Sequence, residues 1–480
     1  MRSHFQFSDI AATIENMKLK ETATAKTTNQ PKANNPDRHL SISEWLLNYS
    51  LQDLPGDLMA GAVVAIMLVP QSMAYSLLAG LPPEVGLYAS ILPLILYPLL
   101  GTSRALAVGP VSMVSLLVAA GIEKLADRNS PEYLTLALTL AAIVGLIKLG
   151  MGLTRLGFLF DFLSHSVIVG FTFAAALTIG CSQVKDLIGV TIPQSEQFSK
   201  LVVYLLESSS KTNFITLAIG IISILILIYF NRFLEGHLKH WGISDKIATL
   251  ITKSSPLVVV ILGTLLVWAW RLDETAGVKI VGTIPSGLPT LTWPFFDGKL
   301  WQSLFPVAFT ISVVGFLESI AIAKSLASSQ PEKVDANREL VALGVANLGA
   351  AVTGGYPVTG GLSRSVVNLS AGANTGLASI IAALLVALTV QFFTPLFYFL
   401  PKTSLAAIII VAVLNLIDIA TFKTIWHESK AEATLLLITF VAVLTIGIET
   451  GIAVGILSGV ILYFWRNKTQ IGVWAKSDRE

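Results

Sequence analysis

Arg364 is the residue whose place in the sequence most needs a chemical explanation. It lies at the start of an apolar stretch, between Gly360 and Asn368 in the segment GGLSRSVVN. Burying an arginine near the centre of a bilayer costs from roughly 3 to more than 10 kcal/mol, so something must offset that cost. Ser363 and Ser365 place hydroxyl groups beside it, and a helix start would add free N–H groups and a positive dipole end. The pattern predicts an anion site. Two other interpretations are a salt bridge within the protein and a side chain that reaches back to the membrane surface.

Glu318 is a carboxylate inside another apolar run, between Phe309 and Lys324. An acidic group at that depth is costly, and it is typical of ion pathways and proton relays. It could load and release a proton, or it could coordinate Na⁺. The competing interpretation is a fixed partner for Arg364. A carboxylate that is paired in only one state would itself be a coupling device.

Gln71 and Tyr75 follow Pro70 in the middle of the first apolar run. Residues four apart share one helix face, and both side chains can donate hydrogen bonds, from an amide and from a phenol. One hypothesis is that both face the site and bind a polar ligand. The other is that they form hydrogen bonds between helices.

Apolar runs that must position these residues follow one another from Leu58 onward. Several are shorter than the roughly 20 residues that cross a bilayer unaided, and the separation of the tenth from the eleventh is the weakest boundary. The fourteen runs lie near 58–79, 85–100, 110–122, 133–153, 162–181, 213–230, 256–270, 303–323, 338–353, 363–372, 375–393, 403–417, 432–447 and 450–465.

The third and tenth runs are short, and each follows an extended stretch rich in Gly and Pro, Ala105–Pro110 and Gly354–Gly361. A pair of interrupted segments at matching places in two halves indicates the binding site of a transporter. Seven runs separate them, and because seven is odd the second half starts from the opposite face of the membrane. The pattern predicts an inverted repeat.

Charge sets the expected orientation. With the N-terminus in the cytoplasm and one crossing for each run, most of the 32 Lys and Arg residues fall on the cytoplasmic side, as the positive-inside rule requires. The bias predicts cytoplasmic termini for a multi-pass protein, although twelve crossings would satisfy it as well. We expect a disordered tail over 1–40, a transport domain over 41–466 and a short tail over 467–480.

Composition excludes several function classes. Charged residues make up 13% of the chain against about 25% in soluble domains, and 54% of residues are hydrophobic. The net charge of +2 gives no basic field for nucleic acid. No metal-ligand spacing, P-loop or dinucleotide fingerprint occurs, so we predict neither a cofactor nor an enzyme.

At these residues the chain resembles the SulP family of anion permeases. The similarity includes Val69–Tyr75, Gly80–Ser90, Ala107–Ser112 and the GLSRS segment at 361–365, and it covers about residue 45 to residue 466. The resemblance implies an all-α fold of fourteen membrane segments, arranged as two inverted repeats of seven with a nucleobase-transporter-like architecture. Segments 1–4 and 8–11 would form a core that moves against a gate of segments 5–7 and 12–14.

The resemblance also implies the site. The anion would bind between the starts of segments 3 and 10, lined by Gln71 and Tyr75, by Ser363 and Arg364, and by the backbone at Gly109, Pro110, Val111 and Ser112. Glu318 matches a carboxylate that couples transport to H⁺ or Na⁺, and members are commonly dimers. Family members usually carry a C-terminal STAS domain, and we expect this chain to lack it, either naturally or by truncation.

These features predict a secondary active transporter of a small oxyanion, with sulfate as the first choice, in the plasma or inner membrane. An elevator-type symport with H⁺ or Na⁺ is the expected mechanism. One alternative is a bicarbonate or dicarboxylate symporter, or an anion exchanger. A second alternative is an uncoupled anion channel.

Overall fold

The computed structural model describes most of the chain between residues 44 and 462. The predicted tails at 1–40 and 467–480 lie outside the described residues. Those described are 44–47, 49–128, 130–158, 165–192, 198–293, 297–327, 333–414, 417, 419–447, 450–459 and 461–462.

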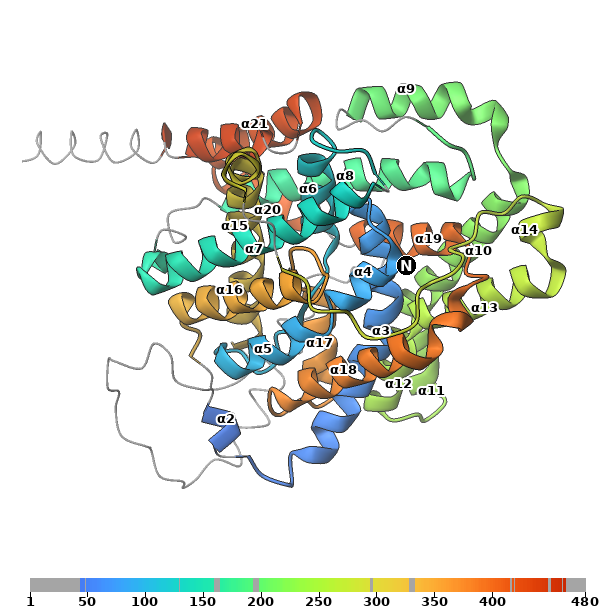
Figure 1. The fold of residues 1–480 in the computed structure, drawn as a ribbon, viewed down its shortest axis with the longest axis horizontal. Coiled ribbons are helices and arrows are strands. Elements are labelled where there is room, and N and C mark those ends of the chain that lie inside the picture. Colours follow the sequence, from blue (N-terminus) through green and yellow to red (C-terminus); the bar gives the residue numbers. More distant parts are fainter. Residues whose placement is uncertain are drawn as a thin grey trace, which may run out of the picture.

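Helices make up most of the described structure, as the apolar runs predict (Figure 1). The elements up to residue 275 are α2 (Glu44–Leu47), α3 (Leu54–Leu78), α4 (Pro83–Tyr88), α5 (Leu92–Leu100), β1 (Val108–Gly109), α6 (Ser112–Ile122), α7 (Pro131–Leu153), α8 (His165–Leu187), α9 (Phe198–Ser208), η2 (Ser209–Lys211), α10 (Phe214–Tyr229), η3 (Phe230–Leu234), α11 (Glu235–His240), α12 (Asp245–Lys253), α13 (Ser255–Trp270) and α14 (Leu272–Thr275). The later elements are α15 (Gly298–Ala327), α16 (Ala336–Val352), β2 (Thr359–Gly360), α17 (Leu362–Ser370), α18 (Leu377–Leu388), η4 (Thr389–Phe393), η5 (Thr394–Phe397), α19 (Lys402–Leu414), α20 (Ile419–Glu428), α21 (Lys430–Ile446) and a helix at Thr450–Gly459.

Each of the fourteen predicted apolar runs overlaps helical residues in the described part of the chain, and the second run spans both α4 and α5. Eight helical stretches there are long and apolar enough to cross a membrane, and they begin with α3, α4, α7, α8, α10, α15, α18 and α19. The number of membrane crossings stays a prediction. The tenth and eleventh runs form separate helices, because α17 ends before Gly372, which has a φ of +102°. A glycine adopts this left-handed backbone without strain.

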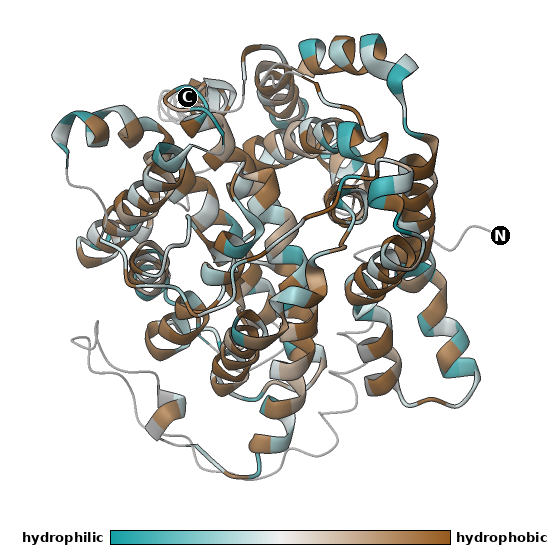
Figure 2. Cartoon of the chain, turned by 45° about the vertical axis from the view of Figure 1, so that its right-hand side comes forward, coloured by the Kyte–Doolittle hydropathy of each residue, from teal (hydrophilic) through white to brown (hydrophobic). Residues whose placement is uncertain are grey.

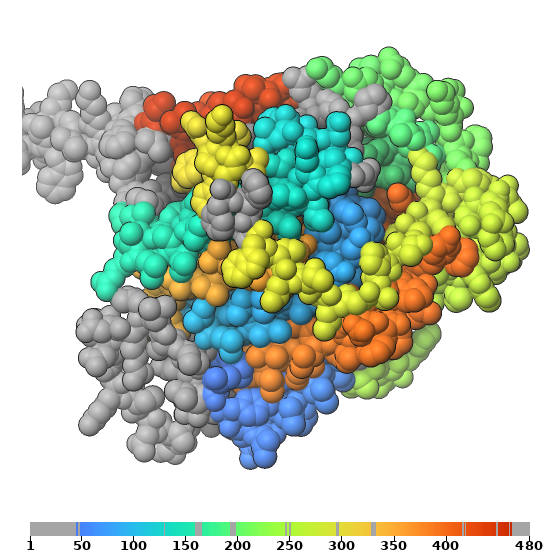
Figure 3. All heavy atoms as spheres, viewed as in Figure 1, coloured from blue at the N-terminus to red at the C-terminus, as the bar shows by residue number. Residues whose placement is uncertain are grey.

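The helices pack in two groups. The first helix group joins α3–α7 to α15–α18, and the second consists of α8, α10, α13, α19, α21 and the helix at 450–459. Within the first group, elements from opposite halves of the sequence lie side by side, and Figure 3 shows atoms of α3 and α5 bordering those of α18. The most extensive packing joins α7 to α16, where a Cβ added to Gly344 would lie 2.6 Å from the Leu149 nitrogen. Small residues permit such contacts between membrane helices.

Hydrophobic residues run along most of the helices, including those at the edge of the molecule (Figure 2). Large side chains on α10 and α13 point outward, including Ile222, Leu225, Leu265 and Trp268, each more than half exposed or close to it. A contiguous apolar surface of this kind is unfavourable in water and is what lipid tails require of a membrane helix. The exterior therefore supports the assignment of these helices to a bilayer.

Candidate functional site

The two interrupted segments meet at the centre of the first helix group. β1 and β2 pair antiparallel, with Val108 opposite Gly360 and Gly109 opposite Thr359. Each strand leads within a few residues into a helix, β1 into α6 and β2 into α17. Because the strands run in opposite directions, the helices leave the pair in opposite directions, and both N-terminal ends face the strand pair. The extended stretches expected before the third and tenth runs are thus confirmed.

Both helix starts keep backbone N–H groups available. No side chain caps α6 at Val111 or α17 at Gly361. The first N–H groups of a helix have no partner within it, and the helix dipole adds a partial positive charge there. Two such ends around one point form an environment that favours an anion.

The guanidinium of Arg364 occupies the space between the two strands' ends. Its side chain is 1% exposed, and Nη1 donates a hydrogen bond of 2.7 Å to the carbonyl oxygen of Pro110. Two glycines leave room for it, since an added Cβ would lie 3.3 Å from Nη2 at Gly109 and 2.8 Å from it at Gly361. The side chain therefore does not reach the membrane surface in this structure.

Two nitrogens of Arg364 are unpaired hydrogen-bond donors. Nε and Nη2 are buried and have no hydrogen-bond partner. Glu318 does not supply one, because no ion pair within 4.0 Å joins the two residues in this structure. Unpaired buried donors are expensive, and a fork of two N–H groups matches the oxygens of an oxyanion. This geometry favours the anion interpretation of Arg364 over a permanent salt bridge.

The serines beside Arg364 differ in their surroundings. The hydroxyl of Ser365 donates to the Gly361 carbonyl oxygen over 2.7 Å and accepts from the Ala107 nitrogen over 2.9 Å. Its single O–H is therefore already donated, and it holds the two segments together instead of offering a donor to an anion. Ser363 lies on the exposed side of α17, where its hydroxyl remains accessible.

Gln71 and Tyr75 lie on α3, and each is 7% exposed. The phenol of Tyr75 lies near enough to the Arg364 guanidinium for the two groups to interact electrostatically. Helix α3 packs against α17, which carries that arginine. The helix face that Gln71 and Tyr75 share is therefore turned towards the interior of the first helix group and away from lipid.

Glu318 lines a narrow apolar cavity of about 220 Å³. The same cavity is bordered by Met113 near the start of α6 and by Leu362 at the start of α17. One carboxylate oxygen, Oε2, is buried without a hydrogen-bond partner. The carboxylate thus lies at a cavity that reaches both helix starts, and it keeps an oxygen available for a proton or a cation.

Several residues that fix this backbone could not be singled out from the sequence. On α15, Ser319 accepts a hydrogen bond from the Gly360 nitrogen over 2.9 Å and bonds the Thr359 hydroxyl over 2.6 Å. On α16, the side-chain amide of Asn347 bonds both the N–H and the carbonyl of Val358. The only available signal was a polar side chain inside an apolar run, which α-helical membrane proteins also show elsewhere.

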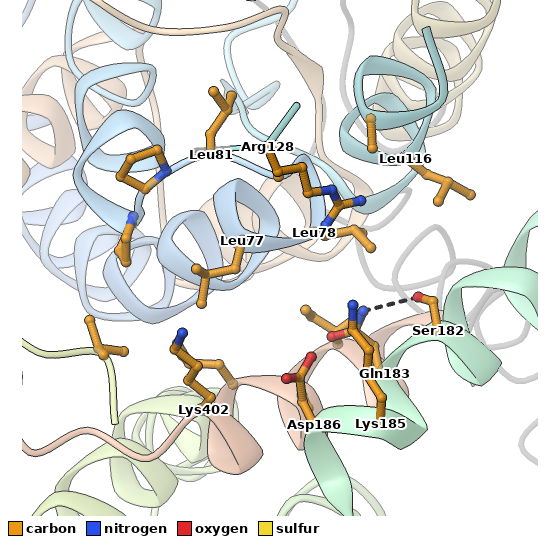
Figure 4. A pocket seen from close by; sticks show the side chains of 18 of the residues that line it. Leu77, Leu78, Leu81, Leu116, Arg128, Ser182, Gln183, Lys185, Asp186 and Lys402 are labelled. Atoms are coloured by element: carbon orange, nitrogen blue, oxygen red, sulfur yellow. Dashed lines mark hydrogen bonds between the residues drawn. The ribbon is translucent and has the colours of Figure 1, made fainter. Parts of the chain in front are cut away.

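A larger cavity of about 560 Å³ lies apart from the predicted site residues, none of which lines it. Arg128 reaches into it from one wall, and Lys185, Asp186 and Lys402 come from α8 and α19 on the other (Figure 4). Arg128 also forms an ion pair with Glu123. Residues of both helix groups thus line each of the two cavities.

Comparison with known proteins identifies relatives over most of the chain. A model of the sulfate permease family matches residues 54–439. Sulfate transporter 4.1, chloroplastic, of Arabidopsis thaliana is 40% identical over 86% of this chain and 58% of its own length. High affinity sulfate transporter 2 of Stylosanthes hamata is 34% identical, over 90% of this chain and 65% of its own length. The chain thus spans less than two thirds of the length of these relatives.

Solved structures share the fold. The murine Solute Carrier 26 family member A9 anion transporter in the inward-facing state has a TM-score of 0.82 at 25% identity, over 94% of this chain and 75% of its own. The transmembrane domain of the cyanobacterial bicarbonate transporter BicA has a TM-score of 0.69 at 22% identity, over 86% and 98%. The family and these relatives are transporters, which confirms the expectation that the chain is not an enzyme.

Proposed function

The chain belongs to the sulfate permease family of multi-pass membrane proteins. From that premise we propose that it carries a small inorganic oxyanion across its membrane, with sulfate as the first choice. The observation that carries the proposal is the buried guanidinium of Arg364, with Nε and Nη2 unpaired between two facing helix starts. Positive groups that include two donors without an internal acceptor, Nε and Nη2, are suited to an anion that enters and leaves.

Each predicted residue has a function in this proposal. Arg364 supplies charge and a pair of donors, while the first N–H groups of α6, at Ser112 and beyond, supply the opposite side. Gln71 and Tyr75 add donors from α3, and Ser363 adds an exposed hydroxyl from α17. Ser365 positions the backbone by the hydrogen bonds it already makes.

Uptake of a dianion needs an energy source. Moving two negative charges into a cell interior at −100 mV costs about 4.6 kcal/mol. We propose that Glu318 provides the coupling by taking up H⁺ or Na⁺ together with the anion. The support is its place at a cavity that borders both helix starts, with one oxygen unpaired.

We further propose an elevator-type movement of a core against a gate. The core would be segments 1–4 and 8–11, which correspond to the first helix group, and the gate segments 5–7 and 12–14, which correspond to the second. The separate packing of the two groups and the cavities between them support this division. Fourteen crossings in two inverted repeats, a plasma-membrane location, cytoplasmic termini and a homodimer complete the proposal.

Transport by the purified chain in proteoliposomes tests the function. Labelled sulfate should accumulate under an imposed H⁺ or Na⁺ gradient and should be displaced by selenate. Arg364→Ala should abolish saturable uptake while still inserting into the vesicles, whereas Arg232→Ala, at an exposed arginine of η3, should transport normally. Saturable uptake by a well-folded Arg364→Ala protein would refute the site.

The same assay separates the alternatives. Stronger competition by bicarbonate or succinate than by selenate would favour those substrates. Flux that requires an anion inside the vesicles would indicate exchange. Large unitary currents in planar bilayers would indicate an uncoupled channel instead of a carrier.

A further inference from the structure

Lys148 is a second buried basic residue, and it has no role in the anion site described above. It lies in the C-terminal third of α7, is 0% exposed, and its Nζ has no hydrogen-bond partner. An ammonium group removed from water and left unpaired is among the most costly side chains in a membrane protein. The position of Lys148 therefore needs an electrostatic explanation.

The ammonium of Lys148 lies next to β2, the strand that leads to Arg364. A Cβ added to Gly315 on α15 would lie 3.3 Å from Lys148 Nζ and 3.2 Å from the Thr359 hydroxyl oxygen. Thr359 belongs to β2, and its hydroxyl donates to the carbonyl oxygen of Gly315. Gly315 thus leaves the space in which the ammonium approaches the strand pair.

Glu318 links the two cations. It lies three residues after Gly315 and so shares the same side of α15. In the described part of the chain it forms no ion pair with Lys148 or Arg364 but lies near enough to both for electrostatic interaction. The three groups form one electrostatic cluster, which we call the central charge cluster: Lys148, Glu318 and Arg364.

Other charged groups on the packed elements lie elsewhere. Glu339 on α16 is in the first turn of its helix and accepts hydrogen bonds from the Tyr97 hydroxyl and from Thr102. Asp57 on α3 is near the start of its helix and accepts from Asn374 and Thr375. Helix α6, which also contacts α7, contains no titratable side chain. The charge balance at the strand pair is therefore set by the central charge cluster.

The charges in this cluster can be counted. With Glu318 ionised, the two cations and one anion leave a net charge of +1. When Glu318 takes up a proton the net charge is +2, which a dianion balances. Without Lys148 the protonated cluster would carry +1, which a monoanion balances.

We propose that Lys148 is the specificity-determining second counter-charge that makes the site select a dianion, one H⁺ being bound at Glu318 for each dianion carried. This proposal rests on the proposed transport function and names its substrate class. Lys148 acts through Coulomb attraction across a medium of low dielectric, without touching the substrate. The proton comes from solution, binds the carboxylate and is released again on the other side.

The test compares ions of two charges in the same vesicles. Full-length protein in proteoliposomes is assayed for labelled sulfate uptake, with selenate as the dianionic and nitrate as the monoanionic competitor. Lys148→Met removes the charge and shortens the unbranched side chain by one atom, and Lys148→Gln is a polar neutral substitution. Lys124→Met in the exposed loop after α6 is the control. Both neutral variants should lower the selenate-to-nitrate preference at least tenfold, while the control keeps it.

A second measurement tests the charge count on the unsubstituted protein first and then on Lys148→Met. In sulfate-for-sulfate exchange the protein changes conformation only with sulfate bound. In the unsubstituted protein the cluster with sulfate and H⁺ bound has no net charge, so the exchange rate should be insensitive to membrane potential. Lys148→Met should make the same exchange depend on potential, because the loaded cluster then carries a negative charge. Exchange by the unsubstituted protein that responds strongly to potential would overturn the charge count.

The outcomes distinguish this proposal from the proposed function. If sulfate uptake is normal and the neutral variants keep the dianion preference, Lys148 is not a counter-charge and the transport proposal stands. If the unsubstituted protein takes up neither class of anion, both proposals fail.

Discussion

Gly361 gives the sharpest test of how the guanidinium is held. A methyl group at this position would lie 2.8 Å from Nη2, 2.9 Å from Cζ and 3.2 Å from Nε of Arg364. These contacts are shorter than van der Waals distance. Because the strand pair lies on another side of the guanidinium, the methyl group of Gly361→Ala must displace the guanidinium from its present position. The displacement breaks the hydrogen bond from Nη1 to the Pro110 oxygen and moves the donors that would meet an anion.

The size of the effect follows from the hydrogen bond to the anion that the displaced guanidinium would lose. A hydrogen bond from a charged donor contributes about 1.5–3 kcal/mol. Since about 1.4 kcal/mol corresponds to a tenfold change in binding, Gly361→Ala should raise the KM for sulfate by roughly 10- to 100-fold. Gly109→Ala places its methyl at 3.3 Å from Nη2, which a small shift can relieve, and its effect should be smaller.

Gly150 on α7 supplies the matched control. Nothing lies within 4 Å of a Cβ added there, so Gly150→Ala should leave transport unchanged and stabilise the helix by about 1 kcal/mol. Initial rates of labelled sulfate uptake over a range of concentrations measure all three variants. A Gly361→Ala protein with the KM of the unsubstituted chain, or a larger effect at Gly109 than at Gly361, would refute the packing argument.

Three further substitutions separate coupling, stability and positioning. Glu318→Gln should weaken uptake driven by a cation gradient more than exchange, and a Gln variant that concentrates sulfate as well as the unsubstituted protein would end the coupling proposal. Glu339→Gln replaces a carboxylate that accepts hydrogen bonds from Tyr97 and Thr102, and it should lower the stability by about 2–4 kcal/mol, seen as a lower Tm with KM unchanged. Ser365→Ala should also lower the Tm, through the lost bonds to Ala107 and Gly361. A Ser365→Ala protein that keeps its Tm but loses sulfate affinity would show instead that this hydroxyl contacts the anion.

The hydrophobic runs predicted the helices because a bilayer imposes length and apolarity on every crossing segment. The extended stretches before α6 and α17 could also be predicted, from glycine and proline content, whereas the separation of the tenth run from the eleventh was the weakest boundary. The pairing of Gly109 with Thr359 could not, because it depends on how two distant segments meet in space. Each half contributes a strand of only two residues, too short for a pattern of alternation.

Site chemistry was predictable only to the level of residue type. A charged group in an apolar run identified Arg364 and Glu318, and the same criterion applied to Lys148, although nothing in the sequence placed it beside β2. Ser363 and Ser365 could not be told apart, because their different surroundings depend on which side of α17 packs against β1. Burial and hydrogen bonding distinguish them.

The position of a bound selenate ion, located by its anomalous scattering in a crystal of the full chain, tests the central claim most directly. The account predicts a peak between the starts of α6 and α17, within hydrogen-bond distance of Nε or Nη2 of Arg364. A selenate peak confined to the larger cavity beside Arg128 and Lys402, with none at Arg364, would contradict it.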